Sequence, residues 1–190
     1  MFKDLVIKAR SFRRFDNSEV IGTKVLYDII DTAHWTPSAA NRQPISFIIS
    51  NKKESNDLIF PTIGWAGYLT DWQGPEPHEQ PTAYIMLCTE TQFLPHLSFD
   101  VGIIAQTIQL AVTDLGLGAC MIASFDKNKL KKILNMPEEY ELLLVIAIGK
   151  PVEKVVLEEV ERDGDIKYYR DENGVHHVPK RIAKITIFDA

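Results

Sequence analysis

One long apolar segment, residues 97–115, limits what this chain can fold into more than any other feature. The segment predicts a helix whose apolar residues lie on most of its circumference: Val101, Ile103, Ile104, Ala105, Ile108, Leu110, Ala111 and Val112. A helix that is apolar on most sides has to be covered nearly all round. A protein core can cover one side, and a second subunit can cover the other.

The rest of the chain predicts a mixture of short strands and helices. Apolar runs predict buried strands at residues 45–50, 83–89, 119–124 and 141–149. Helical spacing of apolar residues predicts helices at residues 2–10, 23–35 and 126–134, and another from about residue 53. An alternating stretch, residues 182–188, predicts one more strand. Because strands and helices do not alternate strictly, the pattern favours an α+β fold over a doubly wound sheet.

Composition limits the class of protein. The chain has 190 residues, of which 45% are apolar, so we expect one domain, residues 1–190, with a sizeable core. The net charge of −5 argues against a nucleic-acid partner. No apolar run reaches the roughly 18 residues of a membrane span, so we expect no membrane association. The only cysteines, Cys88 and Cys120, form no CxxC pair, which favours a reduced, cytoplasmic setting.

The acidic balance makes one basic cluster near the start conspicuous. The stretch "ARSFRRFD" places Arg10, Arg13 and Arg14 within five residues. Guanidinium groups match phosphate geometry and stay charged at any working pH. The cluster therefore favours a local site for one small anion, although surface arginines at a helix end are the alternative. A second basic pair, Lys180 and Arg181 in "VPKR", is either a solvated patch or part of the same phosphate site.

Two further stretches suit a flat ligand. "TPSAANRQP", residues 36–44, predicts a tight turn followed by Asn41 and Gln43, whose amides suit the polar edge of a heterocyclic ring. "GLGACMIASF", residues 116–125, has glycines that either end a helix or let the backbone approach a ligand. An ordinary loop and an ordinary helix end are the respective alternatives.

Other candidate sites fail on spacing. His176 and His177 are adjacent and have no third ligand at metal spacing, so we expect no metal. Cys120 lacks the partners of a cysteine hydrolase, and Ser38 does not lie in a GxSxG motif. The sequence therefore predicts no catalytic side chain.

A long loop, residues 64–81, is rich in glycine, proline and tryptophan. Its aromatic residues Trp65, Tyr68 and Trp72 have two possible roles. They either anchor the loop to a core or line a pocket for a planar electron acceptor. Both alternatives stay open at the level of sequence.

The order of these motifs resembles that of the FMN-dependent nitroreductase family. "RSFRRF", "PSAANRQP", "GLGACMIASF" and a late "GKP" with a basic tail follow one another over nearly the whole chain. The tail "YYRDENGVHHVPKR" is similar to a small, short-loop subgroup. The resemblance implies an α+β fold with a mainly antiparallel sheet flanked by helices. It also implies a homodimer with FMN at the subunit interface and with the long helix in the dimer core.

The resemblance further implies which residues contact FMN. Arg10, Ser11 and Arg13 resemble the N-terminal run that faces the phosphate, the ribityl chain and the ring edge. Pro37, Ser38 and Ala39 resemble the turn that packs on the ring from the other subunit, and Asn41 and Gln43 resemble polar contacts to the ring and ribityl chain. Ala123 and Ser124 match the backbone stretch at the reactive nitrogen and carbonyl of the ring, and Lys180 and Arg181 match the basic tail at the phosphate. Two departures are Ile45, where many members have tryptophan, and the loop of residues 65–81, which replaces a variable insertion.

The implied activity is NAD(P)H-dependent reduction of nitroaromatics, quinones or related small planar acceptors by ping-pong hydride transfer. Two alternatives remain. One is another flavin chemistry on the same scaffold, such as reductive dehalogenation or flavin breakdown. The other is a flavin-binding protein without enzymatic activity.

Overall fold

The computed structural model describes residues 1–97 and 99–186. The chain divides into two compact units. The first consists of Met1–Trp65 and Gly74–Val152, and the second consists of Ala66–Gln73 and Glu153–Ala190. The single domain expected from the chain length stays a prediction.

The first unit contains a five-stranded sheet in which every pair of neighbours is antiparallel. Strands lie in the order β1-β5-β3-β2, and β4 also pairs with β5. The bounds are Phe15–Asp16 for β1, Ser46–Ser50 for β2, Ala83–Glu90 for β3, Gly118–Ile122 for β4 and Tyr140–Pro151 for β5. The two longest strands, β3 and β5, pair at the centre of the sheet and are its most apolar segments.

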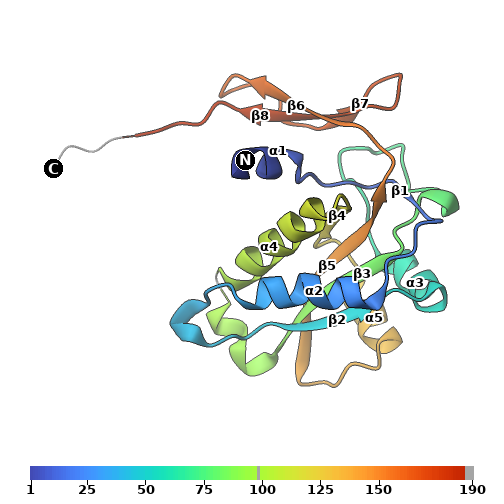
Figure 1. The fold of residues 1–190 in the computed structure, drawn as a ribbon, viewed down its shortest axis with the longest axis vertical. Helices are drawn as coiled ribbons and strands as arrows, with labels where there is room; N and C mark the ends of the chain where they lie inside the picture. Colours follow the sequence, from blue (N-terminus) through green and yellow to red (C-terminus); the bar gives the residue numbers. More distant parts are fainter. Residues whose placement is uncertain (98, 187–190) are drawn as a thin grey trace. The chain divides into compact units, whose positions relative to one another are not determined.

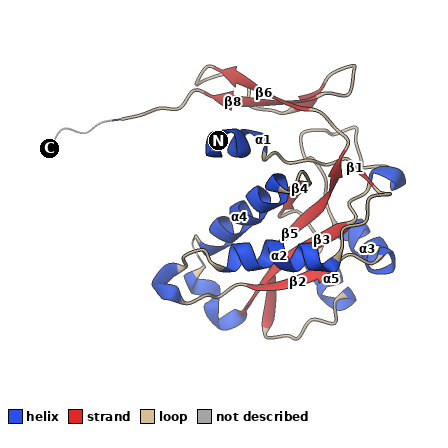
Figure 2. Ribbon diagram, in the orientation of Figure 1, coloured by secondary structure: helices blue, strands red, loops and turns tan. Residues whose placement is uncertain are grey.

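Helices cover both faces of this sheet, as the blue ribbons beside the red strands show in Figure 2. The bounds are Phe2–Lys8 for α1, Thr23–His34 for α2, Lys53–Ile59 for α3, Asp100–Asp114 for α4 and Lys127–Ile133 for α5. Helices α2 and α4 lie side by side over one face (Figure 1), while α3 and α5 pack on the other. Because side chains alternate along a strand, Ile85 of β3 joins the first core and Met86 joins the second. The predicted α+β fold is confirmed.

The long helix α4 begins at Asp100, three residues later than the sequence predicts. A 3-10 helix, Thr91–His96, precedes it. Within α4, the side chains of Ala105, Ile108 and Val112 are buried in the core. On the other side of the helix Gly102 and Gln106 are exposed, and Ile103 is half-buried. One chain therefore covers only one side of this apolar helix.

The second unit contains a three-stranded sheet in the order β6-β8-β7, with bounds Val155–Val160, His176–Arg181 and Tyr169–Arg170 respectively. Strand β8 runs parallel to β6 and antiparallel to β7. The strand predicted at residues 182–188 is wrong for its described part, because residues 182–186 are exposed and form no strand. Residues 187 and 188 lie outside the described part of the chain. Strand β8 was not predicted because its sequence, "HHVPKR", is polar and lacks the apolar pattern of a strand.

The remaining predicted elements agree with the structure to within a few residues. Strand β4 ends at Ile122, so Ala123 and Ser124 lie in the loop that follows it. Asp126 caps α5, as its position suggests, by accepting a hydrogen bond from the Lys129 amide at 2.9 Å. Within the described ranges, each helix is too short or too polar to cross a membrane.

Candidate functional site

The segment that follows α1 is fixed along strand β4. The Phe12 amide donates to the Ala119 carbonyl oxygen at 3.0 Å, and Ser11 forms a parallel bridge with Ala119. The side-chain amide of Gln109, on α4, donates to the carbonyl oxygens of Arg10 and Ala119 at 2.6 and 3.3 Å. Gln109 is only 4% exposed. These contacts hold the first arginine of the cluster at the junction of α1, α4 and β4.

Arg10 retains hydrogen-bonding capacity in this position. One of its terminal nitrogens donates to the Val6 carbonyl oxygen at 2.6 Å. Its buried Nε has no hydrogen-bond partner among the described residues. Partial burial lowers the pKa of the guanidinium, because desolvation disfavours the charged form. A bound anion would both satisfy this N–H group and offset the desolvation.

The other two arginines of the cluster have different partners. Arg14 forms a two-point ion pair with Glu79, in which its Nε lies 2.8 Å from the Glu79 Oε2. Glu79 is nearly buried, so this pair ties the start of the sheet to the loop before β3. Arg13 donates from a terminal nitrogen to the Ser11 carbonyl oxygen at 3.2 Å. Arg14 is therefore a structural residue, and Arg10 and Arg13 remain as candidates for a ligand.

The end of β4 carries the next pair of candidates. Ala123 and Ser124 are both exposed. The Gly64 amide donates to the Ser124 carbonyl oxygen at 2.7 Å, and a Cβ at Gly64 would lie 2.6 Å from the Ser124 Oγ. The two segments thus approach closely, and a side chain at residue 64 would force the Ser124 hydroxyl to move. Ala123 lies four residues beyond Ala119, which is about 13 Å along an extended chain. That separation from the Arg10 segment suits an elongated ligand.

The turn after α2 is the third candidate and has unusual backbone geometry. Ala40, Asn41 and Gln43 have positive φ angles of 52°, 51° and 49°. Few residues other than glycine adopt this conformation, and such outliers concentrate at functional sites. The Gln43 amide donates to the Ser38 Oγ at 2.9 Å, and the Gln43 side chain donates to the Asn41 carbonyl oxygen at 3.2 Å.

A buried carboxylate at the start of α4 holds this turn. The Ala39 amide donates to the Asp100 Oδ1 at 3.0 Å, and Asp100 is 2% exposed. The Asp100 Oδ2 has no hydrogen-bond partner within the described part of the chain. A pocket of about 200 Å³ adjoins the turn and is lined by Pro37, Ser38 and Ile45 among others. The turn thus combines backbone strain, an unpaired buried oxygen and a cavity.

The predicted ligand residues fall into separate groups. Arg10, Ser11 and Arg13 lie beside β4, and Ala123 and Ser124 lie at the end of that strand. The turn of residues 37–43 is attached to Asp100, nine residues before Gln109 on α4, which corresponds to about 13 Å along the helix axis. Lys180 and Arg181 are exposed at the end of β8, in the second unit.

Sequence reasoning missed the two residues that position these groups. Asp100 and Gln109 are polar residues in a largely apolar helix, and both are buried, whereas Gln106 of the same helix is exposed. Buried polar side chains are expected to have specific hydrogen-bond partners. The polar interruptions of the helix pattern were thus the signal that could have identified both residues.

The loop aromatic residues pack inside their own units. Trp65 lies 5.8 Å from Phe60, measured between ring centroids, in the core under α3. In the second unit, Tyr68 packs on Tyr168 at 4.9 Å. The Arg170 guanidinium lies over the Trp72 ring at 4.2 Å. Of the two roles left open by the sequence, anchoring the loop is the one that these contacts favour.

Comparisons with known proteins find relatives that cover most of the chain. The family model for nitroreductases matches residues 6–68 and 80–150. An iodotyrosine deiodinase from Thermotoga neapolitana is 23% identical over 168 residues, and the match covers 80% of this chain and 89% of that protein. YodC of Bacillus subtilis, named provisionally as an NAD(P)H nitroreductase, is 24% identical over 180 residues, with 77% and 88% covered.

A solved structure shares the fold. An FMN-dependent nitroreductase from Clostridium difficile superimposes with a TM-score of 0.64 at 23% identity, covering 79% of this chain and 87% of that one. The residues matched by the family model belong to the first unit, apart from residues 66–68. Lys180 and Arg181 lie outside the matched ranges, so their assignment rests on the sequence pattern alone.

Proposed function

The chain belongs to the nitroreductase family, and from that premise we propose that it is an FMN-dependent oxidoreductase that uses NAD(P)H to reduce small planar acceptors such as nitroaromatics and quinones. Support for the cofactor comes from the family and from the residues around β4. Support for the nicotinamide donor comes from the name of the Bacillus subtilis relative.

The environment of Arg10 carries this proposal. Its backbone is fixed by Gln109, its Nε is buried without a partner among the described residues, and burial opposes its charge. A guanidinium in this state fits a phosphate monoester, which provides several acceptor oxygens and nearly two negative charges. The exposed residues Ala123 and Ser124, at the far end of β4, fit the ring end of the same ligand. The residues present therefore suit FMN.

The residues of this chain would have binding and orienting roles. Arg10 and Arg13 would hold the phosphate and ribityl end, with Ser11 between them. Backbone groups of Ala123 and Ser124 would face the edge of the ring. When bound, FMN supplies hydride transfer from a nicotinamide donor to an acceptor. Because the cofactor carries the electron chemistry, the proposal requires no catalytic side chain.

We further propose that the active form is a homodimer. One chain covers only one side of α4 and leaves Gly102 and Gln106 on the other side exposed. The turn of residues 37–43 is anchored about 13 Å along α4 from the Arg10 segment. A second copy packed on α4 would bury the exposed side of the helix. It would also bring the Pro37, Ser38, Ala39, Asn41 and Gln43 turn of one copy to the β4 residues of the other.

Spectroscopy of the purified protein tests the proposal. After incubation with FMN and removal of free flavin, we expect a yellow protein with one FMN per chain. Under anaerobic conditions NADH or NADPH, added separately, should bleach the visible absorption of the bound flavin. A nitroaromatic or quinone should then restore the colour. Protein that stays colourless would overturn the cofactor assignment. Protein that binds FMN but is not bleached by either donor would overturn the NAD(P)H-dependent activity and leave flavin binding alone or another flavin chemistry.

Reductive dehalogenation is the second candidate activity. The observation in its favour is that two relatives of 23% and 25% identity, each matching 80% of this chain, are named iodotyrosine deiodinases. Reduced protein mixed with 3-iodotyrosine distinguishes the two activities. Release of iodide at a rate comparable with nitroaromatic reduction would favour dehalogenation, and its absence would favour the first proposal.

A further inference from the structure

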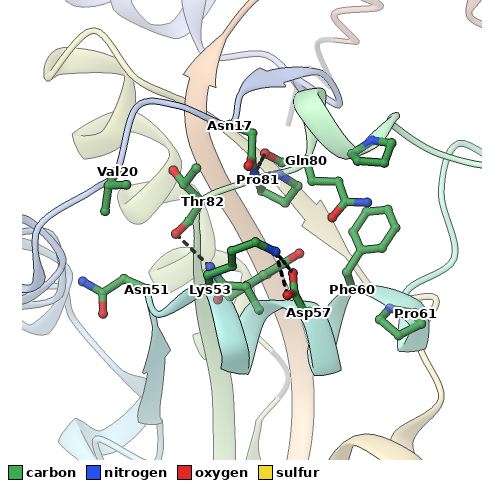
Figure 3. A pocket seen from close by; sticks show the side chains of 13 residues that line it. Asn17, Val20, Asn51, Lys53, Asp57, Phe60, Pro61, Gln80, Pro81 and Thr82 are labelled. Atoms are coloured by element: carbon green, nitrogen blue, oxygen red, sulfur yellow. Dashed lines mark hydrogen bonds and ion pairs between the residues drawn. The ribbon is translucent and has the colours of Figure 1, made fainter.

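A pocket of about 430 Å³ lies on the α3 face of the sheet (Figure 3). Its walls come from α3, from the start of β3, and from the segments around residues 17–20 and 77–82. All of these belong to the first unit. The volume falls within the roughly 300–1,000 Å³ range of small-molecule sites. No residue of the FMN proposal lines this pocket.

The buried wall of the pocket carries an unpaired hydroxyl group. Tyr84, on β3, lines the pocket and has no exposed surface. Its hydroxyl group has no hydrogen-bond partner among the described residues. Burial, reinforced by the nearby Asp57 carboxylate, raises the pKa of the Tyr84 phenol, so the group stays protonated and able to donate. Buried hydroxyl groups in proteins are nearly always paired. An acceptor group bound in the pocket beside Tyr84 would supply the missing partner.

Two asparagines in the walls are held with their oxygen atoms available. The Asn17 side-chain nitrogen donates to the Gln80 carbonyl oxygen at 3.1 Å. The Asn51 side-chain nitrogen donates to the Ile21 carbonyl oxygen and the Thr23 hydroxyl, both at 2.9 Å. Their side-chain oxygens accept no hydrogen bond from the part of the chain that the structure describes. An asparagine fixed in this way presents an acceptor to a ligand N–H group.

The charges that line the pocket cancel. Its charged residues are Lys53 and Asp57, and the Lys53 Nζ lies 2.9 and 2.7 Å from the two Asp57 carboxylate oxygens. Figure 3 shows this pair together on α3. Much of the remaining wall is apolar and includes Phe60 and Pro81. A paired cation and anion beside flat apolar groups favour an uncharged, planar ligand over a phosphate or a carboxylate.

We propose that this pocket binds an uncharged nitrogen heterocycle that carries neighbouring carbonyl and N–H groups, the chemical class of the purine and pyrimidine bases. A ligand carbonyl accepts a hydrogen bond from the Tyr84 hydroxyl, and ligand N–H groups donate to the Asn17 and Asn51 oxygens. Phe60 and Pro81 contact the apolar surface of the ring. The site is independent of the FMN proposal and does not require that the protein be an oxidoreductase.

Calorimetric titration of the full chain, saturated with FMN where it binds, tests this site. The probes are uracil, hypoxanthine and, as a charged analogue, uracil-6-carboxylate. We expect saturable binding of at least one neutral base with a Kd of about 1 mM or lower. The carboxylate should bind at least about tenfold more weakly, because the pocket offers it no unpaired cation. Absence of saturation by both neutral bases, or preference for the carboxylate, would overturn the proposal.

Two variants and a control locate the binding. Tyr84→Phe should weaken binding of the neutral base about tenfold, while the ligand-free protein melts at the same or a higher temperature, because an unpaired buried hydroxyl is lost. Val20→Trp should block binding, since Val20 lines the pocket and is 73% exposed. Tyr140, on β5, does not line the pocket, so Tyr140→Phe should leave the affinity for the neutral base unchanged. Equal affinity in wild-type, Tyr84→Phe and Val20→Trp proteins would place the base elsewhere and refute the assignment.

Discussion

The side chain of Gln109 donates a 2.6 Å hydrogen bond to the carbonyl oxygen of Arg10, so a polar residue buried in an apolar helix fixes the backbone of the first candidate phosphate ligand. The same amide reaches the Ala119 carbonyl oxygen on β4. One glutamine thereby joins α4, the N-terminal segment and β4.

We expect Gln109→Leu to lower both stability and FMN affinity. The substitution leaves the carbonyl oxygens of Arg10 and Ala119 without these bonds, which costs about 1–3 kcal/mol of unfolding free energy. Chemical denaturation measures the stability, and fluorescence titration measures FMN binding. Gln92→Leu, a change at an exposed glutamine outside α4 and outside every proposed site, is the matched control. FMN affinity equal to that of the control would argue against a positioning role.

The first and third arginines of the N-terminal cluster should respond differently to substitution. Arg10→Ala should weaken FMN binding by about 1–3 kcal/mol, the scale of a charge-assisted contact. Arg14→Ala should leave FMN affinity nearly unchanged but lower stability by about 1–2 kcal/mol. This expected loss of unfolding free energy is modest because the Arg14 side chain is 31% exposed, so solvent screens its ion pair with Glu79. Equilibrium FMN titration and urea denaturation of both variants measure the two effects. A reversed pattern would show that Arg14 holds the phosphate.

The stability of the second unit should depend on pH through His177. Hydrogen bonds to Glu158 and then Asp171 raise the pKa of His177 above its ordinary value of 6.5. A raised folded-state pKa means that this contribution is fully present below about pH 6.5 and is lost as the pH rises through the folded pKa. The pKa of Asp171 is lowered, chiefly by the hydrogen bond from the Val175 amide, so its contribution is lost as the pH falls.

NMR titration of the imidazole and melting curves from about pH 5 to pH 9 measure this dependence. His177→Gln should flatten the decline in melting temperature above neutral pH. His34→Gln, at an exposed position near the end of α2, should preserve it. An imidazole that titrates at or below 6.5 would contradict the prediction.

Trp72→Ala should destabilise the second unit and affect every acceptor alike. The change removes the ring beneath Arg170, whose guanidinium also pairs with the buried Glu153 at 3.0 Å. Because Trp72 is half-buried, we expect a loss of about 2–3 kcal/mol, below the usual range for a fully buried aromatic residue. Asp71→Ala, at an exposed neighbour, is the control for the melting temperature. A change in the ranking of acceptors by kcat/KM without a change in melting temperature would instead support a pocket wall.

The two sides of α4 can now be distinguished by substitution. Ile108 has no exposed surface, so Ile108→Glu should prevent folding. Ile103 is half-buried beside exposed Gly102 and Gln106, so Ile103→Glu should leave a folded chain that sediments as a monomer and loses FMN. Sedimentation equilibrium and absorption spectra report the two properties. An Ile103→Glu protein that remains dimeric with FMN bound would place any subunit interface elsewhere.

The sequence by itself determined the elements with the clearest local patterns. The runs that form β3 and β5 are apolar over most of their length, and α2 has an apolar stripe. For each of these elements the spacing of the apolar residues in the sequence agrees with their burial in the structure. The order of short motifs was enough to predict the family. Strand β8 was not predicted because its sequence is polar and shows no strand pattern. Its His177 forms ion pairs with Glu158 of β6 and with Asp171, and contacts between separate segments are not visible in a local sequence pattern.

Only the tertiary structure decided which residues of one motif pair with other parts of the chain and which are left for a ligand. Arg10 and Arg14 look equivalent in the sequence, yet Glu79, 65 residues further along the chain, pairs with Arg14. Likewise, Tyr84 belongs to an apolar run, and its unpaired hydroxyl becomes evident only once α3 and the segment around residue 80 form a pocket beside it. Hydrogen-bond partners and cavities depend on groups that are distant in sequence. The sequence therefore predicts which residues are available, and the fold decides which of them have a partner.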